Sequence, residues 1–355
     1  MLWSNFLHIY QPPTQKELWV RRIADESYRK VFAGLLKIPR ARITLNINGV
    51  LCELLDRYGG RDVLEMIHKL LERGQLELTG SAKYHAFLPL IPKREVERQI
   101  QLNEQTLDHY FGNLWSKSGK RGFFAPEMAY SRTVAEVAQR MGYRWIVIDE
   151  LAFPSGKRPA HDARYTIAGL SGFGAFFRER HLSFAILSSR GAGASPTILR
   201  YLGDRLQQPG YALTAMDGET FGHHRPGLEQ LLFDLMSEPQ IEPLTISDLV
   251  GKFPNALEVE PRDSTWAATK QDMQKKAPYA RWRHDGNQIQ KWQWELTDLA
   301  IAVAGSTTGS ARTLLDQALH SDQYWWASAR PWWSLEMIER GAYELKIVVA
   351  KAETA

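Results

Sequence analysis

Short apolar runs alternate with helical periods across the first 220 residues, and this alternation constrains the fold more than any other feature of the sequence. Helical segments such as Asp62–Arg73, which ends at Gly74, separate several of the runs. Strand, helix and strand at this pitch favour parallel strands joined by right-handed crossovers. The runs with the length and composition of buried strands are Trp3–Ile9, Arg42–Ile47, Gln75–Leu78, Arg121–Phe124, Trp145–Ile148, Leu182–Leu187 and Ala212–Met216.

Seven such strands predict an α/β fold, an incomplete seven-stranded (β/α)7 barrel rather than an open doubly wound sheet. The barrel is expected over residues 1–227. One loop excursion, rich in Gly, Pro and Ser, is expected over Ala152–Gly174, and a second loop over Ser188–Ser195. Residues 228–355 are mainly helical in pattern, and we expect them to form a C-terminal helical region that packs on the barrel and contributes to the cleft.

Composition excludes several classes of protein. The chain has 355 residues, 44% apolar and 24% charged, as is typical of globular proteins. Its single cysteine, Cys52, excludes a disulfide scaffold. The net charge of +4 is spread without a run of five or more like charges, so we expect no nucleic-acid partner. Because no apolar stretch reaches the length of a membrane span and no leader is evident, we expect no membrane partner and a cytoplasmic location. The oligomeric state stays open.

Polar residues follow the predicted strands at their carboxyl ends, where the reactive groups of a βα barrel cluster. Glu127 follows the fourth strand and Asp217 follows the seventh. Burial of an ionised acid beside an apolar strand is costly, so a chemical role is a natural explanation for each. Two carboxylates at different strand ends are the pair that cleavage of a glycosidic bond requires, because one attacks while the other transfers a proton.

The tryptophans favour the same substrate class. The chain has twelve, and eight of them fall after residue 260, where their faces could stack on sugar rings. The usual His and Cys spacings of a metal site are missing, and no Gly-rich phosphate loop follows the first strand. We therefore expect neither a metal nor a cofactor.

Five separated motifs resemble those of the family 57 glycoside hydrolases. They occur in the family's order between residues 8 and 326, and the match is specific as a set although each piece alone is weak. The resemblance implies a seven-stranded (β/α) barrel with a helical C-terminal part, acting on α-glucans. The motifs are His8-Ile-Tyr-Gln-Pro12, Gly74-Gln-Leu-Glu77 continuing to His85, Phe124-Ala-Pro-Glu127, Asp217-Gly-Glu-Thr-Phe-Gly222 and His320-Ser-Asp-Gln-Tyr-Trp-Trp326.

The resemblance also implies roles for individual residues. Glu127 is expected to be the nucleophile and Asp217 the general acid/base of a retaining double displacement on α-1,4-linked glucans, either amylase-like or 4-α-glucanotransferase-like. Tyr10, Phe124 and His224 depart from residues common in the family, which leaves the exact specificity open. The expected substrate-binding residues are His8, Gln11, Glu77, His85, Phe124, Glu219, His224, Trp266, Trp282, Asp322 and Trp325.

Two alternatives remain at the level of sequence. One is a barrel deacetylase that acts on polysaccharide through a bound metal, against which the missing ligand spacings weigh. The other is a non-catalytic glucan-binding protein on the same scaffold, against which the presence of both Glu127 and Asp217 weighs.

Overall fold

The computed structural model describes residues 1–116, 122–154, 157–191 and 193–353. Its strands are β1 (Leu2–Ile9), β2 (Ile43–Ile47), β3 (Leu76–Gly80), β4 (Gly122–Phe123), β5 (Trp145–Asp149), β6 (Arg164–Ile167), β7 (Gly174–Arg178), β8 (Tyr211–Asp217), β9 (Glu242–Leu244) and β10 (Ala256–Val259).

The α-helices connect and cover these strands. They are α1 (Glu17–Ile23), α2 (Arg29–Leu36), α3 (Gly49–Arg57), α4 (Arg61–Glu72), α5 (Lys93–Phe111), α6 (Asn113–Ser116), α7 (Arg132–Arg140), α8 (Arg180–Leu187), α9 (Ser195–Leu202), α10 (Leu228–Ser237), α11 (Ile246–Lys252), α12 (Lys270–Gln274), α13 (Gln288–Ala304), α14 (Ser310–Ala318), α15 (Asp322–Trp326) and α16 (Leu335–Glu353).

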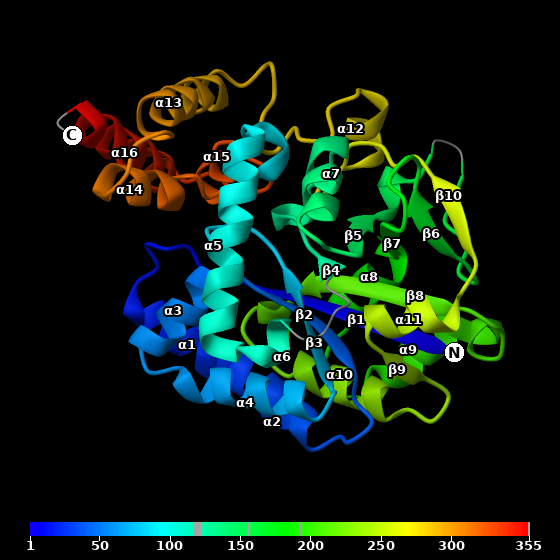
Figure 1. Cartoon of the computed structure of the whole chain (residues 1–355). Coiled ribbons are helices and arrows are strands. Elements are labelled where there is room, and N and C mark those ends of the chain that lie inside the picture. Colours follow the sequence, from blue (N-terminus) through cyan, green and yellow to red (C-terminus); the bar gives the residue numbers. More distant parts are fainter. Residues whose placement is uncertain (117–121, 155–156, 192, 354–355) are drawn as a thin grey trace.

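Seven parallel strands curl in the order β8-β1-β2-β3-β4-β5-β7, with helices outside them (Figure 1). The ends of the curl approach each other where Glu179, just after β7, donates its backbone N–H to Leu213 of β8 at 2.7 Å. Among the described strands no ladder joins β7 to β8, so the structure confirms the prediction of an incomplete seven-stranded barrel.

Aromatic and aliphatic side chains fill the interior of the curl. Phe6, Phe124, Trp145 and Phe176 form one buried cluster there with residues of β8. Gly122 of β4 leaves room for the indole of Trp145, because a Cβ at this position would lie 2.0 Å from a ring carbon. The interior of the barrel is therefore packed with side chains.

The prediction of the sixth strand was wrong. Residues Leu182–Leu187 belong to helix α8, and the strand that fills this place in the barrel is β7, at the end of the expected loop excursion. A short apolar run cannot be told from a buried helical segment by its periodicity alone, which explains the exchange. The predicted fourth strand is seen as β4, but its expected first residue, Arg121, lies outside the described residues.

The described parts of the expected loop over Ala152–Gly174 contain a further strand, β6, which pairs antiparallel with β7 and parallel with β10. Residues 155–156 of that loop and residue 192 of the second expected loop lie outside the described residues. Strand β9 pairs with β1. Two strands after Gly227 thus return to strands before it, although most of the later chain is helical, as predicted.

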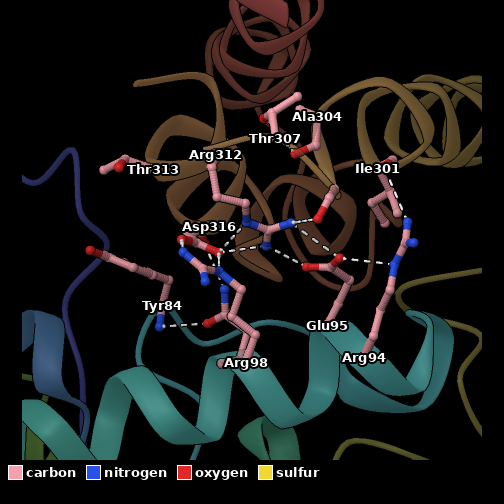
Figure 2. Close-up of polar contacts among 12 residues, drawn as sticks. Tyr84, Arg94, Glu95, Arg98, Ile301, Ala304, Thr307, Arg312, Thr313 and Asp316 are labelled. Carbon is pink, nitrogen blue, oxygen red and sulfur yellow. Dashed lines mark hydrogen bonds and ion pairs between the residues drawn. The ribbon is translucent and has the colours of Figure 1, made fainter. Parts of the chain in front are cut away.

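A buried ion-pair cluster fastens the C-terminal helices to the barrel (Figure 2). Arg312 of α14 contacts both Glu95 of α5 and Asp316, and the side chains of all three are at most 5% exposed. Arg98 of α5 adds a two-pronged contact to Asp316 at 2.8 and 2.7 Å. In Figure 1, α13, α14 and α16 gather beside the upper end of α5. No helix in the described ranges is long and apolar enough to cross a membrane.

Candidate active site

A cleft of about 550 Å³ opens at the carboxyl ends of the barrel strands. Residues that follow β1, β3, β4 and β8 form one side, and residues between β10 and α16 form the other. The lining residues are His8, Tyr10, Gln11, Pro12, His85, Glu127, Asp217, Glu219, His224, Trp266, Ala267, Arg281, Asp322, Trp325 and Trp326. The cleft therefore brings together segments more than 300 residues apart in sequence, as the contact between Tyr10 and Asp322 shows.

Glu127 enters the cleft from a strained turn after β4. Its φ and ψ are 62° and 16°, and Met128 is also left-handed with a φ of 51°. Non-glycine residues in this region are costly, and such strain concentrates at functional sites. Trp266 fixes the side chain, because its indole Nε1 donates to Glu127 Oε2 at 2.9 Å while its backbone N–H donates to the Glu127 carbonyl at 3.2 Å.

Asp217 is the last residue of β8, directly opposite His8 of β1 in the parallel register. Arg178, the last residue of β7, is the basic group that most favours its ionised form. The guanidinium of Arg178 is 4% exposed, contacts Asp149 at 3.4 Å and lies 5.7 Å from the centre of a Trp266 ring. The ends of β7 and β8 thus supply a buried cation and a partly buried acid, with Trp266 beside the cation.

Burial raises the pKa of both carboxyl groups, since it disfavours the charged form. The pKa of Glu127 rises to about 8, with the charge of Asp217 adding to the effect of burial, while the Trp266 hydrogen bond acts in the opposite direction. The pKa of Asp217 rises to about 6, held down by Arg178. The pair can therefore hold a proton near neutral pH, which acid–base chemistry requires.

Glu219 is a third acid of the cleft and is itself buried, and burial together with the charge of Asp217 raises its pKa to about 7. Its Oε1 accepts the Tyr28 hydroxyl at 2.5 Å and the Tyr10 backbone N–H at 3.1 Å. Tyr28 ends a π-helical turn over Ala24–Tyr28, a local form common at functional sites. Gly222 lets this turn approach, because a Cβ there would lie 2.0 Å from a carbonyl oxygen of the turn.

Two neutral histidines form a hydrogen-bonded wall of the cleft. Their Nε2 atoms, in His8 and His85, lie 3.1 Å apart, so one must donate and the other accept. His8 Nδ1 contacts Asn46 Oδ1 at 2.8 Å and His85 Nδ1 contacts Ser321 Oγ at 2.9 Å. If Ser321 Oγ donates to His85 Nδ1, then His85 Nε2 donates to His8 Nε2 and His8 Nδ1 donates to Asn46 Oδ1. Each ring nitrogen then has a hydrogen-bond partner. Burial lowers the pKa of both imidazoles, that of His85 to about 4, so both stay neutral.

Tyr10 joins the two sides of the cleft. Its ring stacks on His85 with centroids 4.0 Å apart, and its hydroxyl donates to Asp322 Oδ2 at 2.7 Å. Arg281, on the far side, is fixed by a 3.0 Å hydrogen bond from its Nε to the Ala267 carbonyl. These contacts make an almost closed ring of polar groups around the carboxylates.

Comparison with known proteins identifies the family. The sequence model of Glycosyl hydrolase family 57 matches residues 7–260, which include Glu127, Asp217 and most of the cleft. The chain belongs to this family. The prediction made from the five motifs is confirmed.

The family 57 relatives include an alpha-amylase of Pyrococcus horikoshii, 23% identical over 268 residues, which are 70% of this chain and 40% of that protein. The chain thus spans less than half the length of this relative. A 4-alpha-glucanotransferase structure from Thermococcus litoralis superimposes with a TM-score of 0.78 at 18% identity, covering 98% of this chain and 59% of that one. A family 57 branching enzyme from Pyrococcus horikoshii gives 0.75 at 14% identity, covering 99% and 88%. At these identities the structures establish a shared fold.

Most of the residues predicted for the family 57 site lie together in the cleft. Three do not. Glu77 is near the start of β3, where its Oε1 accepts Thr44 Oγ1 at 2.7 Å and the Ser247 N–H at 3.1 Å, and burial raises its pKa to about 7. Its place at the amino end of a parallel strand puts it away from the mouth, which corrects the placement expected from the motif. The predicted residues that line the cleft are His8, Gln11, His85, Glu127, Asp217, Glu219, His224, Trp266, Asp322 and Trp325.

The other two exceptions are buried aromatic residues. Phe124 is fully buried beneath the cleft floor, with ring centroids 4.9 Å from His8 and 5.6 Å from Trp266. Trp282 is fully buried as well and stacks on Phe87 at 4.7 Å. Both therefore support residues of this region from the core and present no face to a ligand in the cleft.

Sequence reasoning missed several residues that complete the site. Arg178 ends β7, a strand that was not predicted from the sequence, so its place at a barrel end was not visible. Arg281 carries no pattern of its own, whereas Trp326 belongs to the fifth motif but was not among the predicted binding residues. In the described ranges, no group of three or more His, Cys, Asp and Glu side chains is arranged to hold a metal ion.

Proposed function

We infer that this family 57 chain is a retaining glycosidase or transglycosidase that acts on α-glucans, with Glu127 as nucleophile and Asp217 as general acid/base. The observation that carries the proposal is the meeting of these two partly buried carboxyl groups, from different strand ends, in one cleft walled by aromatic rings and hydrogen-bonding side chains. The family membership and relatives named alpha-amylase and 4-alpha-glucanotransferase support the substrate class.

The first half of the reaction forms a glycosyl-enzyme. An oxygen of Glu127 bonds to the anomeric carbon while the bond from that carbon to the leaving oxygen breaks, and the leaving oxygen takes the proton of Asp217. The Trp266 N–H already engages Glu127 Oε2, so Oε1 is the oxygen without that bond. In the second half, water or an acceptor hydroxyl gives its proton to Asp217, and its oxygen displaces Glu127.

This scheme requires Glu127 ionised while Asp217 carries the proton. The charge of Asp217 raises the pKa of Glu127, so protonation of Asp217 removes that repulsion and favours ionised Glu127. The Trp266 hydrogen bond and the charge of Arg281 act in the same direction. Positive charge that develops on the sugar in the transition state attracts the Glu127 carboxylate further. The substrate itself thus stabilises the protonation state that the reaction requires, in which Glu127 is ionised and Asp217 is protonated.

The remaining cleft groups suit a sugar chain. Trp325, Trp326 and Tyr10 supply aromatic surface for the apolar faces of pyranose rings. Glu219 and Asp322 supply carboxylate oxygens that can accept hydrogen bonds from hydroxyl groups. Hydrolysis and glycosyl transfer share the first half of the reaction and differ only in which oxygen enters in the second, so the proposal includes both.

Product analysis with a ladder of maltooligosaccharides tests the proposal. We expect the wild-type chain to shorten or redistribute the ladder and Glu127→Gln to lose this activity. Shorter products alone indicate hydrolysis, and both longer and shorter products indicate transfer. Glu77→Gln is the matched control, because it also neutralises a buried glutamate of raised pKa but outside the cleft. An unchanged ladder with folded wild-type protein would refute catalysis on α-glucans and favour the glucan-binding alternative if affinity remains.

A further inference from the structure

His320 is a buried histidine that the reaction scheme leaves unused. It lies between α14 and α15, is 3% exposed, and is held by an antiparallel backbone bridge to Ala86. Its Nδ1 lies 3.2 Å from Asp322 Oδ2 and its Nε2 lies 3.0 Å from Glu344 Oε2. Both ring nitrogens therefore face carboxylate oxygens, one at the cleft and one on helix α16.

This arrangement determines the charge of the ring. A neutral imidazole has one N–H, so its other nitrogen would direct a lone pair at a carboxylate oxygen. Only the doubly protonated ring donates to both. Burial alone would lower the pKa of His320, but the hydrogen bonds and charges of Asp322 and Glu344 outweigh it and raise the pKa to about 9. Other titratable groups near this site in the described ranges include His85, which is neutral, and Tyr10, whose pKa is raised by burial and by the charge of Asp322, so that it is neutral too.

The contact also orients Asp322. Its Oδ2 is occupied by His320 and by the Tyr10 hydroxyl, while Oδ1 has no hydrogen-bond partner among the described residues. The side chain is 25% exposed and lines the cleft, so Oδ1 is the oxygen available to a sugar hydroxyl. Burial tends to raise the pKa of Asp322, but the hydrogen bond and charge of His320 outweigh burial and lower it.

The geometry points to His320 as a positioning residue: an imidazolium, anchored by Glu344, that keeps Asp322 ionised and turned toward a sugar hydroxyl. The substrate part of this inference rests on the proposed function. The arrangement links helix α16 to substrate binding although the helix itself does not line the cleft. Loss of the His320 proton would leave Asp322 and Glu344 facing each other's charge without the cation between them, and Asp322 would lose the contact that sets its orientation.

A titration tests the charge without any substrate. In protein with isotopically labelled histidines, NMR follows each imidazole with pH, and His320→Asn identifies the signal of His320. We expect this ring to remain an imidazolium at pH 7 and to titrate near 9. Glu344→Gln should move the transition to lower pH, because it removes one of the two anions. A ring that is neutral at pH 7 would overturn the inference.

Binding tests the positioning role. Maltoheptaose is titrated calorimetrically into Glu127→Gln and into the same chain with His320→Asn or Glu344→Gln added. We expect about 10-fold weaker binding with His320→Asn, the scale of a lost hydrogen bond to a charged group. Glu344→Gln, which keeps the imidazole, should bind normally at low pH and lose affinity at a lower pH than its parent. Glu336→Gln is the control, since it removes an exposed ion pair of the same helix.

The outcomes separate the two proposals. In the active chain, His320→Asn should raise KM about 10-fold with a smaller effect on kcat, the pattern of a lost binding contact. Affinity unchanged by both variants would overturn the positioning role. A chain that neither binds nor converts α-glucans would refute the proposed function, and the titration alone would then decide the charge of His320.

Discussion

Replacing Arg312 by methionine should loosen the C-terminal helices from the barrel. Arg312 contacts Glu95 and Asp316, and its Nη1 also donates to the Gly305 carbonyl at 3.0 Å. Methionine keeps much of the apolar stem but removes the charge. Removal of one partner from a buried ion pair costs about 3–5 kcal/mol, because the remaining charge loses its counterion in a dry environment.

Two neighbouring arginines decide where in this range the stability cost of Arg312→Met falls. Arg98 still pairs with Asp316 at 2.7 Å, and Arg94 still lies 3.3 Å from Glu95. We therefore expect Arg312→Met to lower the free energy of unfolding by about 3 kcal/mol, the lower end of the range. Urea denaturation at pH 7, followed by tryptophan fluorescence and circular dichroism, measures the change. The exposed pair between Arg340 and Glu336 gives the control, and Arg340→Met should cost less than about 1 kcal/mol.

A double-mutant cycle tests the cause. Glu95→Gln removes the charge that Arg312→Met leaves unpaired, so the double variant should be more stable than the sum of the single effects predicts. Activity should fall with stability, because α14 leads directly into the segment that carries Asp322 and Trp325. Strict additivity, or a loss below about 1 kcal/mol for Arg312→Met, would refute the claim that this pair fastens the region.

Four further predictions follow from the site. Glu77→Gln should keep the α-glucan activity within a few-fold of wild type, measured as initial rate, because Glu77 lies outside the cleft; a loss as large as that of Glu127→Gln would contradict its placement. Trp266→Phe should lower kcat about 10-fold while the protein stays folded, because it removes the N–H that holds Glu127 Oε2 and keeps a smaller aromatic ring in its place; unchanged kinetics would rule out that role. Met128→Gly should lower the unfolding free energy by about 2 kcal/mol or more, because the loss of a fully buried core side chain outweighs the relief of strain at a φ of 51°, and a higher melting temperature would contradict this. Glu127→Gln should stabilise the fold more at pH 9 than at pH 5: the carboxyl with its pKa raised to about 8 destabilises the native state increasingly as pH rises from about 4.3, its unfolded value, through 8. Equal melting-temperature gains at both pH values would show that the pKa is not raised.

Most of the barrel could be predicted from the sequence, because its strands are buried on both faces and appear as continuous apolar runs. The exception is the sixth strand of the barrel. Strand β7 follows a segment rich in glycine, and the apolar run Leu182–Leu187 comes only four residues after it. Local pattern could not decide which of the two crosses the barrel, since the answer depends on pairing with β5, far away in the sequence.

The site was predictable only where it follows strand ends. Glu127 and Asp217 were found because each follows a recognisable strand and matches a motif. Arg281 was not, because its place depends on how the segment after β10 folds back over the barrel. Glu77 shows the opposite failure: it belongs to a motif of the family, but its position in the strand directs it to Thr44 and the start of α11.

The position of β1 has a consequence for how the chain reaches its native state during synthesis. Of the strands that the structure describes, β1 is made before the others, but it lies inside the sheet, between β2 and β8, and also pairs with β9. The indole of Trp3 finds its partner Thr214 only 211 residues later. Until the ribosome has released β8, one apolar edge of β1 stays unpaired, so contacts of high sequence separation limit folding speed. In this interval the unpaired edge exposes apolar strand surface, which favours aggregation and chaperone binding.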